Sequence, residues 1–75
     1  MISKILVQME NGVPVRNCLV TLVFRGLAGP AAYTDADGWA VVPHRAYGLC
    51  DVYVKNEKQA ELFAPGITVV KIIAQ

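Results

Sequence analysis

The chain has 75 residues, which is the length of one domain spanning residues 1–75. Hydrophobic residues make up 55% of it and charged residues 17%, against about 45–50% and about 25% in an average domain. The net charge of +1, from basic and acidic residues scattered along the chain, excludes the electrostatic signature of a nucleic-acid-binding or membrane-surface protein. A domain this small cannot bury so much apolar side chain in its own core. We therefore expect part of it to form a surface that a neighbouring molecule covers.

The predicted elements are all β-strands, because apolar and polar residues alternate in short runs that end at Gly, Pro, Asn or Asp. In chain order, we predict strands over residues 3–9, 16–25, 31–35, 39–43, 49–55, 58–63 and 67–74. Turns are predicted at Asn11-Gly12, Gly26–Pro30, Pro43–Gly48, Asn56-Glu57 and Ala64-Pro65-Gly66. No run has helical periodicity. Short strands with a turn every 8–12 residues or so predict an all-β fold, a seven-stranded antiparallel β-sandwich.

The segment YTDADGWAVV, residues 33–42, raises three alternatives: a metal loop, a catalytic carboxylate pair, or a turn. Asp37-Gly38 between two alternating runs favours a hairpin turn, because both residues tolerate positive φ. Asp35 can also accept a hydrogen bond from the backbone two residues further on. A calcium loop needs more oxygen ligands than the following aliphatic residues supply. We predict a hairpin turn, and adventitious cation binding or catalysis remain the alternatives.

The residues with reactive side chains do not form a recognisable motif. Cys18 and Cys50 are predicted to be reduced, buried thiols, with a disulfide as the alternative. Two isolated cysteines and one distant histidine lack the spacing of metal ligands. His44 is predicted to be exposed in a loop, and Ser3 has no partner within reach along the sequence. The prediction is a protein that is not an enzyme, with no catalytic residues, no cofactor and no metal.

Several segments resemble one known family. Residues 12–22, GVPVRNCLVTL, resemble the first long strand of carboxypeptidase-regulatory-like domains, also called prealbumin-like, with the pattern G-x-P-[LV]-x-x-A-x-V-x-L. Residues 34–38, TDADG, resemble the family's T-D-x-x-G hairpin, and residues 48–54, GLCDVYV, its G-x-Y-x-[VL]-x-V strand, with Cys50 in place of Tyr. Bacterial immunoglobulin-like repeats share much of this pattern. The resemblance covers residues 12–74 and implies a non-catalytic immunoglobulin-like sandwich that is usually attached to a larger protein.

Strand alternation predicts which side chains face the core. Cys18, Val20, Leu22 and Phe24 share one side of their strand, as do Cys50, Val52 and Val54. The resemblance also implies that Ala40 and Val42 face inward. The outward positions are then unusually apolar for a sandwich with solvated faces. The predicted interface comprises Leu19, Val23, Trp39, Val41, Tyr53 and Val69. The alternatives are an error in the strand register or isolated exposed aliphatic residues without function.

The favoured function is a non-catalytic structural or interaction module that packs on copies of itself or on a larger assembly. A small accessory protein of a phage or virus particle would suit this description. The alternative is a carbohydrate-binding module that uses Trp39 and a tyrosine on its surface. The N-terminal segment MISKILVQMEN lacks the features of a signal peptide, and no run is apolar enough to span a membrane. We expect a protein that is cytoplasmic as synthesised and that would reach the outside only on a larger particle, such as a virion, or after processing. Its expected partner is protein rather than nucleic acid or membrane, with a glycan as the alternative.

Overall fold

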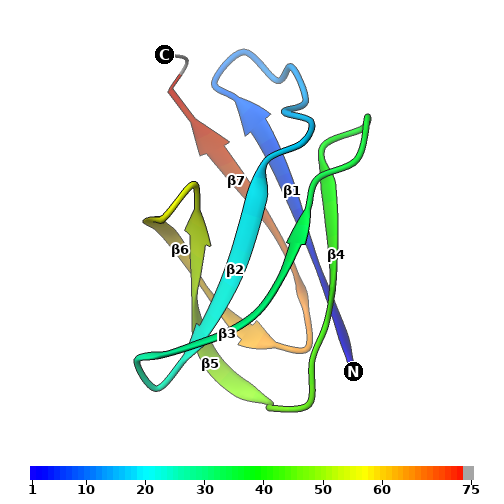
Figure 1. Cartoon of the computed structure of the whole chain (residues 1–75). Helices are drawn as coiled ribbons and strands as arrows, with labels where there is room; N and C mark the ends of the chain where they lie inside the picture. Colours follow the sequence, from blue (N-terminus) through cyan, green and yellow to red (C-terminus); the bar gives the residue numbers. More distant parts are fainter. Residues whose placement is uncertain (74–75) are drawn as a thin grey trace.

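The computed structural model describes residues 1–73 of the chain, except for the side chain of Ala28. The seven strands are β1 (Ile2–Met9), β2 (Leu19–Phe24), β3 (Leu27–Tyr33), β4 (Trp39–Pro43), β5 (Gly48–Val54), β6 (Glu57–Ala64) and β7 (Ile67–Ile72). They form a three-stranded sheet in the order β4-β1-β7 and a four-stranded sheet in the order β3-β2-β5-β6 (Figure 1). The prediction of an all-β fold with two packed sheets is confirmed. The last predicted strand reached residue 74, which lies outside the described residues.

The strand directions correct one part of the prediction. β1 pairs with β7 in parallel, with Leu6 opposite Val69, whereas its other neighbour β4 is antiparallel to it. The prediction of an entirely antiparallel sandwich is therefore wrong at this pair. A parallel pair needs a long connection between its strands, and almost the whole domain lies between β1 and β7. Apolar alternation is the same in both arrangements, so it gives no information on strand direction.

The chain segment between β3 and β4 corrects a second part. β3 belongs to the four-stranded sheet and β4 to the three-stranded sheet, so the Asp35–Gly38 turn carries the chain from one sheet to the other. The turn exists as predicted, but it does not close a hairpin. Two neighbouring strands with a tight turn between them read as a hairpin locally, and only their pairing partners show that they separate.

Two tight hairpin turns overlap the predicted ones, and each begins one residue earlier than predicted. Arg25-Gly26 joins β2 to β3, and Lys55-Asn56 joins β5 to β6. All four residues have positive φ (53°, 75°, 52° and 68°), the conformation of a two-residue turn whose twist matches its strands. β3 begins directly after the first turn and runs through Pro30, which was predicted to lie in a break. Proline is tolerated there because β3 is an edge strand.

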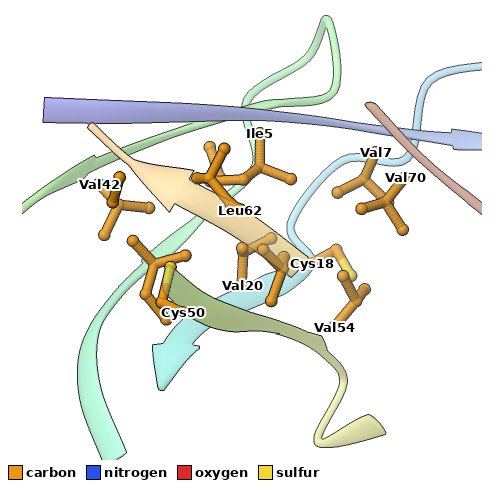
Figure 2. Close-up of a cluster of buried hydrophobic side chains, with 13 residues drawn as sticks. Ile5, Val7, Cys18, Val20, Val42, Cys50, Val54, Leu62 and Val70 are labelled. Carbon is orange, nitrogen blue, oxygen red and sulfur yellow. The ribbon is translucent and has the colours of Figure 1, made fainter. Parts of the chain in front are cut away.

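The core lies between the two sheets and is built mainly from Val, Ile and Leu (Figure 2). The predicted inward residues are confirmed: Cys18, Val20, Leu22, Ala40, Val42, Cys50, Val52 and Val54 are all buried, and Phe24 is partly buried against them. β1 contributes Ile5 and Val7 from the centre of its sheet, and β6 and β7 contribute Leu62 and Val70. Within the described part of the chain, there is no helix long and apolar enough to cross a membrane.

Candidate functional site

The outward side chains of the three-stranded sheet form one surface, called here the β1 face. Its members are Ile2, Lys4, Leu6, Gln8, Trp39, Val41, Pro43, Ile67, Val69 and Lys71. The pairing register places Trp39, Leu6 and Val69 in one row across the sheet, and Val41, Lys4 and Ile67 in the next row. Val41, Val69 and Ile67 are 45%, 50% and 66% exposed. Apolar side chains therefore dominate this face, and its only charged members, Lys4 and Lys71, are cationic.

The outward side chains of the four-stranded sheet form a second surface, called the β2 face, with a different composition. Its members include Leu19, Thr21, Val23, Tyr33, Leu49, Asp51, Tyr53, Lys58, Glu61 and Phe63. Lys58 Nζ lies 3.3 Å from Asp51 Oδ1 and 3.0 Å from Glu61 Oε2. The hydrogen bond to Glu61, followed by that to Asp51, raises the pKa of the Lys58 ammonium group. An exposed ion-pair network thus occupies part of this face, beside exposed apolar residues such as Leu49 and Phe63, which are 61% and 73% exposed.

The structure divides the predicted interface residues between these two surfaces. Trp39, Val41 and Val69 lie together on the β1 face. The other three, Leu19, Val23 and Tyr53, lie on the β2 face, on the opposite side of the sandwich. One partner cannot cover all six at a single flat contact. Alternation identified them as outward-facing, but it contains no signal for the sheet to which each strand belongs.

Ser3 and His44 form a buried pair that the sequence analysis missed. His44 is 7% exposed and Ser3 is fully buried, so the prediction of an exposed loop histidine is wrong. Ser3 Oγ lies 2.8 Å from His44 Nε2, and His44 Nδ1 lies 2.7 Å from the carbonyl oxygen of Ala46. A carbonyl oxygen can only accept, so Nδ1 carries a hydrogen, and in the neutral ring Nε2 accepts from the Ser3 hydroxyl. Ser3 Oγ in turn accepts the backbone N–H of Gly66 at 3.2 Å.

The arrangement has the order of a nucleophile, a base and an orienting acceptor, yet its position favours a structural role. Ser3 Oγ has no exposed surface through which a substrate could reach it. The network instead joins the start of β1, the chain after β4 and the turn before β7. Ser3 and His44 are 41 residues apart in the sequence. No spacing rule connects them, and the pairing of β1 with β4 brings them together.

The acidic turn uses its oxygen atoms to bind its own backbone. Asp35 Oδ1 accepts the N–H groups of Asp37, at 2.9 Å, and Trp39, at 3.0 Å. The Asp35 carbonyl oxygen accepts the N–H of Gly38 at 3.0 Å. The predicted hydrogen bond to the residue two positions on is confirmed. Among residues 1–73, no group of three or more His, Cys, Asp or Glu side chains is placed to hold a metal ion.

Asp35→Ala is expected to destabilise the protein by about 1–2 kcal/mol, because two backbone N–H groups at the crossing between the sheets lose their acceptor. Asp37→Ala is the matched control, since no bond to its carboxylate was found in the described structure, and it should change stability by less than about 0.5 kcal/mol. Urea unfolding followed by circular dichroism measures both. Equal losses in the two variants would contradict this account of the turn.

The two cysteines are free and buried, as predicted, and they lie far apart. Val20 pairs with Val54 across the antiparallel strands β2 and β5. Cys18 lies two residues before Val20, and Cys50 lies four residues before Val54, so the two cysteines lie in opposite directions from this pair. The offset of six residues corresponds to about 20 Å at 3.3 Å per residue. A disulfide needs Cα atoms about 4.4–6.8 Å apart, so the alternative of an intramolecular bridge is wrong. Burial raises the pKa of both thiols.

This pKa shift predicts a loss of stability in alkali. Because the folded-state pKa of Cys18 and Cys50 is raised, the unfolded chain releases these protons first, and the stabilisation present at lower pH falls as pH rises above about 8.5. The free energy of unfolding, measured between pH 7 and 10, should decline. The decline should be shallower in the Cys18→Ala variant than in wild type. Identical slopes would contradict a contribution from this thiol.

A hollow lies at one end of the sandwich, between the Arg25-Gly26 turn and residues 45–51. Arg25, Arg45 and Tyr47 are among its lining residues. Tyr47 is 78% exposed, which leaves its ring available for stacking. Trp39 lies on the β1 face, near the opposite end of β4 from this loop. Trp39 and Tyr47 therefore do not share one surface.

Comparison with known proteins adds no assignment to this geometry. No protein-family model matches the sequence, and the comparison with curated proteins found no significant match. The resemblance to carboxypeptidase-regulatory-like domains stays a prediction at the level of the family. Its coarser content, a small all-β domain with two packed sheets, agrees with the structure.

Proposed function

We propose that the protein is a non-catalytic structural or interaction module that packs on copies of itself through the three-stranded sheet. The observation that carries this proposal is the β1 face, where the row Trp39, Leu6 and Val69 lies next to the exposed Val41 and Ile67. Covering about 400 Å² of apolar surface contributes roughly 10 kcal/mol of favourable free energy to association. Association itself costs about 4–15 kcal/mol. A face of this kind is thus sufficient for weak to moderate association.

The contrast between the two faces supports the choice of the three-stranded sheet. On the β2 face, Lys58 already has its ion-pair partners Asp51 and Glu61, and desolvating these charges would oppose burial. On the β1 face, Lys4 is flanked by Val41 and Ile67, so its long apolar stem can lie along them while the ammonium group reaches the rim. Burial of the β1 face therefore has the smaller electrostatic cost.

The finer fold assignment and the biological setting belong to the same proposal. An immunoglobulin-like sandwich of the carboxypeptidase-regulatory-like kind is supported by the inward Cys18, Val20 and Leu22 and by the T-D-x-x-G turn at residues 34–38. Such domains serve as appendages, and a phage or virus particle offers a surface made of repeated copies. An accessory protein of such a particle would use an apolar sheet face for attachment.

The test compares one substitution on each face. Val69→Lys places a charge in the central row of the β1 face, and Leu49→Lys places the same charge on an exposed position of the β2 face. Sedimentation velocity across micromolar to millimolar concentrations should show association of the wild type. Val69→Lys should weaken it at least tenfold, or about 1.4 kcal/mol, while Leu49→Lys leaves it unchanged. A wild type that stays monomeric throughout would overturn the proposal.

A carbohydrate-binding module is the second candidate, and the hollow beside Tyr47 favours it. An exposed aromatic ring next to Arg25 and Arg45 combines a stacking surface with hydrogen-bond donors, which is how proteins hold sugar rings. Titration with mono- and disaccharides, followed by NMR chemical shifts, tests it. Shifts confined to residues 23–27 and 45–51, and lost in Tyr47→Ala, would support a glycan site. Unchanged spectra would exclude it for these sugars.

A further inference from the structure

The four sheet edges differ in how well they are protected against pairing with another strand. β3 carries Pro30, and β6 carries charged residues along much of its length. β4 is short and ends in Pro43, and its Trp39 carbonyl oxygen already accepts the N–H of Asp35 at 2.9 Å. β7, with the sequence ITVVKI, contains one charge and no proline. β7 is therefore the unprotected edge of the three-stranded sheet.

The backbone groups that β7 offers can be assigned from its pairing with β1. Lys4 donates its N–H to the carbonyl oxygen of Gly66 at 3.0 Å, which directs the backbone of residue 66 toward β1. Successive residues of a strand alternate in direction, so the even-numbered residues of β7 bond to β1. The N–H and C=O groups of Ile67, Val69 and Lys71 then point to the open edge. Their side chains lie on the β1 face.

We propose that β7 pairs antiparallel with β7 of a second copy, about a two-fold axis at Val69. Each Val69 faces its equivalent, and each Ile67 faces Lys71 of the other copy. All three outward-pointing residues of each strand are then hydrogen-bonded. This inference rests on the proposed function and deepens it, because it specifies the contact through which copies associate.

The register follows from charge and from proline. A pairing centred on Lys71 would place two ammonium groups opposite each other, which is destabilising. A pairing centred on Ile67 would bring Pro65, which has no N–H, into the ladder and leave Lys71 outside it. Of the pairings centred on Ile67, Val69 and Lys71, the residues whose backbone groups point to the open edge, only the one centred on Val69 keeps Pro65 out of the ladder and the two lysines from facing each other. This self-complementarity favours a second copy of the chain over an unrelated strand.

The pairing has a consequence for the β1 face. It joins the three-stranded sheets of two copies into one continuous sheet, so the two β1 faces lie side by side and double the apolar surface available to a larger assembly. The contact itself involves few residues, against about 20–30 a side in a standard interface. A dimer held by this edge alone is accordingly expected to dissociate in the micromolar range or above.

Proline substitutions at matched positions test the edge. Val69 and Val41 are both valines of the β1 face, 50% and 45% exposed, on its two opposite edges. The even-numbered positions along β4 bond to β1, because the Gly38 carbonyl oxygen accepts the Val7 N–H and the His44 N–H bonds to the Met1 carbonyl oxygen. The odd-numbered Val41 therefore points its N–H away from β1. Proline at either site removes only an edge donor and should leave the monomer folded. Val69→Pro should weaken self-association at least tenfold in sedimentation velocity, and Val41→Pro should leave it unchanged.

Cysteine substitutions at the same two positions provide an independent readout. Paired residues on adjacent antiparallel strands have Cα atoms about 5.5 Å apart, within the range of a disulfide. Val69→Cys should form a reducible covalent dimer under mild oxidation, whereas Val41→Cys and the wild type, with its buried thiols, should form no covalent dimer. Equal effects of the two prolines, or equal cross-linking of the two cysteines, would overturn the edge contact while the proposed function stands. A monomeric wild type would overturn both.

Discussion

Gly38→Ala is expected to destabilise the protein by roughly 2–5 kcal/mol, the sum of backbone strain of about 1–2 kcal/mol and steric overlap of about 1–3 kcal/mol. Gly38 has φ +86°, a conformation that residues with a Cβ rarely adopt. A Cβ at this position would lie 2.7 Å from the carbonyl oxygen of Val7 and 3.0 Å from Pro14 Cβ. Backbone atoms of β1 cannot move aside easily, because the Val7 N–H also bonds to Gly38 at 2.8 Å.

Gly12→Ala separates the two causes. Gly12 has a similar φ of +91°, but a Cβ there would meet nothing within 4 Å. It should therefore show the backbone strain alone, about 1–2 kcal/mol. Urea unfolding followed by circular dichroism measures both variants. At about 0.05–0.15 kcal/mol per residue, a chain of this length has a total stability of roughly 4–11 kcal/mol, so Gly38→Ala removes a large part of it. Equal losses in the two variants would show that the contact with β1 is unimportant.

Ser3→Ala is expected to have the second large effect, a loss of roughly 2–6 kcal/mol. The substitution removes the donor to His44 Nε2 and the acceptor for the Gly66 N–H. A buried polar group left without a partner costs about 1–3 kcal/mol, and here two such groups result from one change. The loss should appear as a lower urea midpoint with little change in the slope of the transition.

Thr34→Val is the matched control for this prediction. Thr34 is also buried, and its Oγ1 accepts a single bond, from the N–H of Cys18 at 2.9 Å. Valine keeps the shape of threonine and leaves one unpaired group, so the expected loss is about 1–3 kcal/mol. If Ser3→Ala cost no more than Thr34→Val, the link between β1, the chain after β4 and the turn before β7 would contribute less than its geometry indicates.

The two association tests address different levels of the proposal. Val69→Lys against Leu49→Lys asks whether the three-stranded sheet carries self-association. The proline and cysteine pairs at Val69 and Val41 ask whether the contact runs along β7 or across the whole β1 face. An interaction module can use both, since edge pairing leaves the enlarged apolar face open to a further partner.

Local features of this fold were predictable from the order of the residues alone. Period-two alternation identified the seven strands and assigned Val20, Leu22 and Val52 to the core, and the structure confirms these residues as buried. Asp35 was correctly predicted to bind its own backbone. These features succeed because each depends on residues a few positions apart, where strand geometry and side-chain chemistry act directly.

The way in which the strands combine could not be predicted from local sequence patterns. Three features depend on segments that are distant in the sequence: the parallel pairing of β1 with β7, the crossing between sheets at Asp35–Gly38, and the buried Ser3–His44 pair. The alternation of apolar and polar residues within each strand would be the same with other partners, so it could not predict them. The same holds for the division of Trp39 and Tyr53 between opposite faces. The physical reason is that a strand's inward and outward sides are set by its own backbone. The neighbours of a strand, its direction and the sheet to which it belongs depend on the whole fold. The chain adopts the combination of distant segments that buries the most apolar surface while every backbone hydrogen bond is satisfied.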